Sequence, residues 1–134
     1  MNRPAAGAVV AALLLAGCGQ AGGSSAQGPY GGLDAEILAW RNDLESHHVA
    51  CQAKVEGKGC ESFEVTCKAA QEIGPDEIAK GVTAKVVAAM RFNGRAADGS
   101  TGKPGSAFAL FTKHGHTWAR TEAMPVNMTT CAPL

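Results

Sequence analysis

The stretch VTAKVVAAMRF, residues 82–92, decides the fold. Its apolar side chains recur at every second position: Val82, Ala84, Val86, Ala88, Met90 and Phe92. The polar residues Thr83, Lys85 and Arg91 fall on the other face, together with Val87 and Ala89. A repeat of two residues is typical of a β-strand with one buried face. We therefore expect a strand here, with its first face packed against a helix.

That helix is predicted upstream, over residues 33–48. Its apolar residues are spaced four, three and four apart and form one stripe of a 3.6-residue repeat: Leu33, Ile37, Trp40 and Leu44. Asp34 is the expected N-cap, which puts Leu33 and Leu38 in the two positions of a hydrophobic staple. We expect the stripe to pack on the first face of the 82–92 strand.

Residues 61–73 fit two structures. Apolar side chains alternate with polar ones at Phe63, Val65, Cys67 and Ala69, as in a half-buried strand. The segment also fits a helix that ends at Gly74. We favour the strand because Val65 and Thr66 are β-branched. Residues 75–80 are expected to form one helical turn.

The last third of the chain predicts a hairpin after a loop. Residues 93–105 are rich in Gly, Asp and Ser and are expected to be an exposed loop. Residues 106–113 and 116–123 are expected to be strands joined by a two-residue turn at His114-Gly115, and Pro125 ends the second. The expected fold class is α+β: one N-terminal helix packed in two layers on an antiparallel meander of about four strands.

The first 18 residues carry the pattern of an export signal. Arg3 is the only charge in residues 1–17, and the apolar run that follows is far too short for a bilayer core of about 30 Å. The run ends in Leu15-Ala16-Gly17-Cys18, which resembles the lipobox of bacterial lipoproteins. The resemblance implies a signal peptide over residues 1–17, cleavage before Cys18 and a diacylglyceryl group on the Cys18 sulfur. The alternative is a chance cysteine at the end of an ordinary secretory signal peptide.

The same resemblance implies a location and a domain organisation. Acyl chains on Cys18 would hold the protein at a membrane, with each buried methylene contributing about 0.8 kcal/mol. Gly19, where retained lipoproteins usually carry Asp, resembles the pattern of lipoproteins sent to the outer membrane, facing the periplasm. Residues 18–32 are rich in Gly, Ser and Gln and are expected to be a flexible tether. Residues 33–134 are expected to be one small domain.

The charge balance excludes two classes of partner. Lys plus Arg and Asp plus Glu are both 12 in the full chain, and loss of residues 1–17 removes only Arg3 from this balance. A chain so close to neutral lacks the basic surface that nucleic acid or anionic lipid would require. We therefore expect no nucleic-acid partner, and membrane attachment through the lipid on Cys18 alone.

Four cysteines remain after Cys18: Cys51, Cys60, Cys67 and Cys131. An even number in an exported chain indicates two disulfides, and three connectivities are possible. We favour Cys51–Cys60, which closes a short loop, with Cys67–Cys131 holding the C-terminal tail. Zinc is the alternative, but these spacings match no familiar pair of zinc ligands.

Few residues suggest catalysis. The four histidines fall at a predicted helix end and in a predicted turn, where solvated polar side chains are common: His47, His48, His114 and His116. No serine-centred nucleophile elbow is present. The Gly-rich segment 93–105 lacks the order of glycines followed by Lys and Ser/Thr that cradles a phosphate. We therefore expect no catalytic residue, no cofactor, no metal site and no enzymatic activity.

Three functions are compatible with these observations. The first is a non-enzymatic envelope lipoprotein that binds another envelope protein or polymer. The second is a small inhibitor of a hydrolase, whose projecting 93–105 loop enters a cleft. The third is a small-molecule-binding helix-on-sheet module, with a pocket lined by Trp40, Met90, Phe108 or Trp118. We favour the first because it requires only the anchor and the domain.

Overall fold

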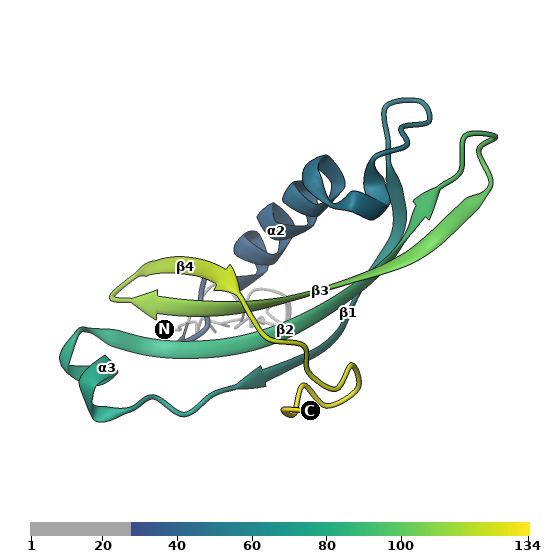
Figure 1. Cartoon of the computed structure of the whole chain (residues 1–134). Coiled ribbons are helices and arrows are strands. Elements are labelled where there is room, and N and C mark those ends of the chain that lie inside the picture. Colours follow the sequence, from purple (N-terminus) through teal and green to yellow (C-terminus); the bar gives the residue numbers. More distant parts are fainter. Residues whose placement is uncertain (1–27) are drawn as a thin grey trace, which may run out of the picture.

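A computed structural model describes residues 28–134 as one main helix and a four-stranded antiparallel sheet, in the order β1-β2-β3-β4 (Figure 1). The elements are α2 (Leu33–His47), the 3₁₀ turn η2 (Val49–Cys51), β1 (Cys60–Ala70), α3 (Pro75–Ala79), β2 (Val82–Arg95), β3 (Thr101–His114) and β4 (Thr117–Glu122). The predicted signal peptide and the lipidation site Cys18 lie outside the described residues. Within residues 28–134, no helix has the length and apolar character needed to cross a bilayer.

The first face of β2 lies in the main core, as the two-residue repeat predicted. Val86, Ala88, Met90 and Phe92 belong to one buried cluster with Leu33 and Trp40 of α2. The Trp40 ring meets Phe111 of β3 edge to face, with 5.7 Å between ring centroids. Ile37 and Leu44, the other members of the predicted stripe, pack against the same cluster. The stripe on α2 therefore contacts the sheet along the length of the helix (Figure 1).

The start of α2 differs from the prediction. The N-cap is Gly32, at φ 89°, and not Asp34, which lies inside the first turn. Only glycine adopts this left-handed conformation without steric cost, so the backbone of Gly32 determines where the helix begins. Asp34 still favours the helix, because a carboxylate in the first turn interacts well with the helix dipole. The predicted staple is absent, since Leu38 is 53% exposed.

The second face of β2 is also buried. Val87, Ala89 and Cys131 form a cluster on this side, which we call the reverse face. The C-terminal tail crosses this face below the sheet in Figure 1. Cys131 is bonded to Cys67 of β1, and Cys51 is bonded to Cys60; these are the pairs that the sequence analysis favoured. The disulfide from Cys67 thus holds the tail against a face that the sequence suggested was half polar.

The segment 93–105 was predicted to be a loop, and most of it is strand. Only residues 96–100 connect β2 to β3. Gly94 and Gly105 do not mark a loop but close packing: a Cβ on Gly94 would clash with the Ala50 carbonyl, and one on Gly105 with the Phe92 ring. The result is a long hairpin that projects beyond α2 (Figure 1).

Other predicted elements agree with the structure in kind and differ at their ends. Residues 60–70 are a strand, so the helical alternative for this segment is wrong. The predicted turn at residues 75–80 is the short helix α3. The β3–β4 turn falls one residue later than expected, at Gly115 and His116, because His114 still pairs with Thr117.

Candidate binding surface

A depression lies between the second half of α2 and the β3–β4 edge. We call it the helix–edge groove, and its volume is about 540 Å³. Its lining comes from three places: Trp40, Asp43, Leu44, His47 and His48 of α2 and its C-terminus; residues 106–109 of β3; and residues 120–123 with Pro125. Apolar atoms form much of this lining, and charged groups stand at its rim.

An ion pair links the two walls of this groove. Arg120 of β4 donates through Nη2 to the Asp43 carboxylate of α2. Arg120 is the better shielded of the two, with 27% of its side chain exposed against 54% for Asp43. The pair therefore fixes the spacing of α2 and β4 at the rim, and its Coulomb energy is reduced by the solvent around Asp43.

The two adjacent histidines have different surroundings. His48 Nδ1 accepts the Ala50 backbone N–H at 3.0 Å. The His48 ring also meets Phe92 edge to face, with 4.8 Å between centroids. His47 is exposed. His48 thus caps η2 and packs on the core, and this structural role accounts for its position.

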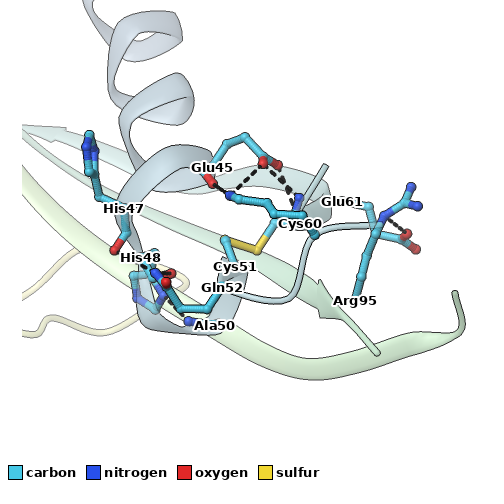
Figure 2. Close-up of a disulfide and its surroundings, with 11 residues drawn as sticks. Glu45, His47, His48, Ala50, Cys51, Gln52, Cys60, Glu61 and Arg95 are labelled. Carbon is cyan, nitrogen blue, oxygen red and sulfur yellow. Dashed lines mark hydrogen bonds and ion pairs between the residues drawn. A yellow bond between two sulfur atoms is a disulfide. The ribbon is translucent and has the colours of Figure 1, made fainter. Parts of the chain in front are cut away.

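Glu45 ties the end of α2 to the loop between Cys51 and Cys60 (Figure 2). The Glu45 carboxylate accepts the backbone N–H groups of Gly59 at 2.8 Å and Cys60 at 3.0 Å. Lys54 Nζ lies 3.3 Å from the same carboxylate. Burial raises the pKa of Glu45, but the two backbone hydrogen bonds and Lys54 outweigh it, so the pKa lies below its ordinary value. Glu45 therefore binds the loop in its ionised, carboxylate form.

The segment that leads into α2 is docked on the sheet. Trp118 Nε1 donates to the Gly31 carbonyl at 2.7 Å, and Lys113 Nζ lies 3.4 Å from the Pro29 carbonyl. The Lys113 ammonium is also 5.6 Å from the centroid of the Trp118 ring. The sequence placed residues 28–32 in the tether, whereas these contacts attach them to the β3–β4 end of the body.

A second depression, on the reverse face, has a volume of about 610 Å³. Val87 and Leu110 line it from the sheet, and Val126 from the tail. Met124 and Leu134 at its margin are 81% and 86% exposed. Its lining is mostly apolar, and it lies against the tail that Cys131 holds in place.

The predicted candidate residues are dispersed. Of the four residues proposed for a small-molecule pocket, Trp40 and Phe108 line the helix–edge groove, whereas Met90 is buried in the core and Trp118 holds Gly31. His114 and His116 lie in the β3–β4 region, far along the sheet from the groove that His47 and His48 line. Within residues 28–134, no group of three or more His, Cys, Asp or Glu side chains is placed to hold a metal ion.

The residues that shape the groove were not predicted from the sequence. Asp43 and Arg120 are 77 positions apart, and neither belongs to a motif. The opposite charges on a predicted helix and a predicted strand were the only available signal. No protein-family model, curated protein sequence or solved structure matches this chain.

Proposed function

We propose that this protein is a lipid-anchored lipoprotein of the bacterial cell envelope, whose two-layer body binds another envelope protein or polymer without catalysing a reaction. The anchor is Cys18, and the membrane is the outer membrane on its periplasmic side. The binding surface is the helix–edge groove with the adjoining edge of β3.

The anchor is supported by the lipobox-like sequence and by the cysteine chemistry. Disulfides persist in oxidising compartments such as the periplasm. Both bonds, Cys51–Cys60 and Cys67–Cys131, have buried partners: Cys51, Cys60 and Cys131 are between 0% and 4% exposed. A chain that reaches this compartment behind a lipobox is expected to carry lipid on Cys18.

The position of residues 28–32 supports an orientation for the body. This segment is held at the β3–β4 turn by Trp118 and Lys113. Cys18 precedes residue 28 by ten positions, so even a fully extended chain would span at most about 36 Å between them. The β3–β4 turn would therefore face the membrane, and the C-terminal end of α2 would face outward.

The helix–edge groove is the observation that carries the binding role. It is open, its volume is about 540 Å³, and it combines an apolar lining with the charged rim residues Asp43 and Arg120. Binding sites for proteins and small ligands commonly combine apolar surface with a few polar groups in this way.

The test has an anchor arm and a partner arm. The intact gene is expressed in a Gram-negative host, and the mature protein is analysed by mass spectrometry. We expect an N-terminal Cys18 carrying fatty acid, and release of the Cys18→Ser variant from the membrane fraction. A first residue other than Cys18, or a Cys18 without fatty acid, contradicts the anchor.

The partner arm uses crosslinked envelopes. The lipidated protein is isolated after crosslinking, and the adducts are compared with those of an Asp43→Arg, Arg120→Glu double variant and of each single variant. We expect one dominant adduct that the single variants weaken, since each leaves two like charges at the rim. Equal adducts from wild-type protein and all variants contradict a role for the groove.

The projecting hairpin favours hydrolase inhibition as a second candidate. Its tip, residues 96–100, is held by four hydrogen bonds. Ala96 N–H donates to the Ser100 carbonyl and Gly99 N–H to the Ala96 carbonyl, both at 2.9 Å, and Ser100 N–H and Oγ–H donate to Asp98 Oδ1 at 2.9 and 2.6 Å. A tip fixed in this way would enter a cleft at a low cost in entropy. The test is to replace residues 96–100 with an Asn-Gly turn and to assay a panel of serine, cysteine and metallopeptidases. Inhibition that survives the replacement contradicts this function.

A further inference from the structure

The edge of β3 is only partly covered. β3 spans Thr101–His114, but β4 pairs only with the part from Ala109 to His114. Beyond it, the Ala123 N–H donates to the Phe108 carbonyl at 3.1 Å. Pro125 then lacks an N–H, and the disulfide from Cys131 to Cys67 holds the following tail on the reverse face. Among the described residues, no strand pairs with this side of β3 before Phe108.

The unpaired backbone groups can be identified from the register. β3 pairs with β2 without irregularity from Pro104 to Lys113. The Phe108 carbonyl points away from β2, because it accepts from Ala123. Backbone groups in an antiparallel strand alternate in direction with a period of two. The N–H and C=O of Ser106 and the C=O of Pro104 therefore point to the open side, and Ser106 and Pro104 are exposed.

The β1 edge of the sheet is irregular. β1 pairs with β2 through two irregularities, between Glu61 and Glu64 and between Val65 and Cys67. Ser62 there adopts φ 59°. Such bulges twist an edge and interrupt its hydrogen-bonding pattern, which prevents strands from adding to it. The β3 edge at residues 104–108 offers a regular row of backbone groups next to the helix–edge groove.

The groove lies directly beside this edge. Ser106, Ala107 and Phe108 line the helix–edge groove, which Trp40 and Leu44 bound on the helix side. The side chains of residues 105–107 are a glycine, a serine and an alanine, so a neighbouring backbone can approach closely. A strand added here would project alternate side chains over the apolar lining.

We infer that the β3 edge at residues 104–108 is a strand-addition site, and that its occupant is an extended segment of the partner protein with apolar side chains at alternate positions. This inference rests on the proposed binding function and specifies its partner. Main-chain hydrogen bonds to Ser106 and Pro104 would supply register, and the groove would select the side chains. The protein's own tail does not fill the site, because Cys131 holds it on the opposite face.

The test uses an immobilised library of synthetic ten-residue peptides that alternate apolar and polar residues. The protein is the secreted chain with Cys18→Ser, studied as wild type at position 106 and as Ser106→Pro and Ser106→Ala. Ser106→Pro removes the outward N–H and leaves the β2 side unchanged, whereas Ser106→Ala keeps the N–H. We expect the best peptides to bind wild type and Ser106→Ala equally, and Ser106→Pro at least tenfold more weakly.

A second measurement leaves the protein untouched. Two peptides are compared, one N-methylated at every odd amide and one at every even amide. We expect one set of methyl groups to abolish binding and the other set to leave it unchanged. The inference is overturned if peptides bind Ser106→Pro as tightly as wild type, or if N-methylation leaves binding unchanged whichever set of amides carries the methyl groups. Self-association that buries this edge in sedimentation experiments also overturns it, because a second copy would then be the occupant.

Failure here is distinguishable from failure of the proposed function. If Ser106→Pro still forms the crosslinked envelope adduct, the binding function stands and the strand-addition site is wrong. If Cys18 carries no lipid and no adduct forms, the proposed function itself fails.

Discussion

The Glu45 carboxylate accepts the backbone N–H of Cys60 at 3.0 Å, across 15 positions of sequence. This bond joins the last turns of α2 to the first residue of β1, beside the Cys51–Cys60 disulfide (Figure 2). The same carboxylate accepts from Gly59. One acidic side chain therefore satisfies two neighbouring donors at the start of a strand.

Glu45→Gln is expected to lower the free energy of unfolding by about 1–2 kcal/mol at pH 7, since an amide has only one acceptor oxygen for two donors. The pKa of Glu45 is lower in the folded protein than in the unfolded chain. The ionised Glu45 side chain therefore contributes its full share to the free energy of unfolding above about pH 4.3, the pKa in the unfolded chain. This contribution is lost as the pH falls through the lower pKa of the folded protein. Urea titrations from pH 7 to pH 3 should show the wild-type advantage shrinking below about pH 4.3. Glu72→Gln, at an exposed position, is the control and should show no such trend.

Removal of the two disulfides is expected to have unequal effects. The Cys67–Cys131 bond closes a separation of 64 residues and Cys51–Cys60 one of 9. The chain-entropy model then gives losses of about 4 and about 3 kcal/mol for the paired Cys→Ala variants. Thermal unfolding measures both. Dye binding to exposed apolar surface should increase mainly without Cys67–Cys131, because Val87 and Ala89 would lose their cover. A larger loss from the short-loop variant would contradict this account.

Gly94→Ala is expected to destabilise the protein by about 2 kcal/mol. A Cβ at this position would meet the Ala50 carbonyl, so η2 and the hairpin would have to separate. Gly74→Ala is the matched control: its Cβ would meet only Glu77 Oε1, at 3.7 Å, and its φ of −74° suits alanine. Both substitutions reduce the entropy of the unfolded chain alike. Equal unfolding midpoints for the two variants would refute the close approach.

Trp118→Phe is expected to loosen the segment that leads into α2. Phenylalanine keeps the ring but cannot donate to the Gly31 carbonyl, which the indole contacts at 2.7 Å. The expected loss is about 1 kcal/mol, with faster proteolytic cleavage near residues 28–32. Limited proteolysis followed by mass spectrometry locates the cut. Trp40→Phe removes an indole from the core and should lower overall stability without favouring that site; cleavage that is the same in both variants would count against the docking.

The helix and the central strand were predictable because their patterns are local. The stripe from Leu33 to Leu44 reflects the buried face of α2, and the two-residue repeat in β2 reflects the strand face that packs against it. The β-branched residues Val65 and Thr66 correctly favoured a strand for β1. These signals depend only on neighbours in sequence, which is why the α+β class could be predicted without any structure.

The predictions that were wrong concern features that depend on contacts between residues distant in sequence. Gly94 and Gly105 suggested a loop, but they allow close approach to Ala50 and Phe92. The N-cap moved to Gly32 because its backbone conformation, and not a side chain, starts α2. The groove and the open edge depend on where β4 ends. No pattern in residues 117–123 predicts the end of this strand.

The spacing of the cysteines also imposes an order of maturation. Under oxidising conditions Cys51 and Cys60 can join as soon as both are present, but Cys67 has no native partner until Cys131 follows 64 residues later. During that interval the thiols closest to Cys67 along the nascent chain are Cys60 and Cys51. Early closure of the Cys51–Cys60 bond would keep both of these thiols from pairing with Cys67 before Cys131 is available.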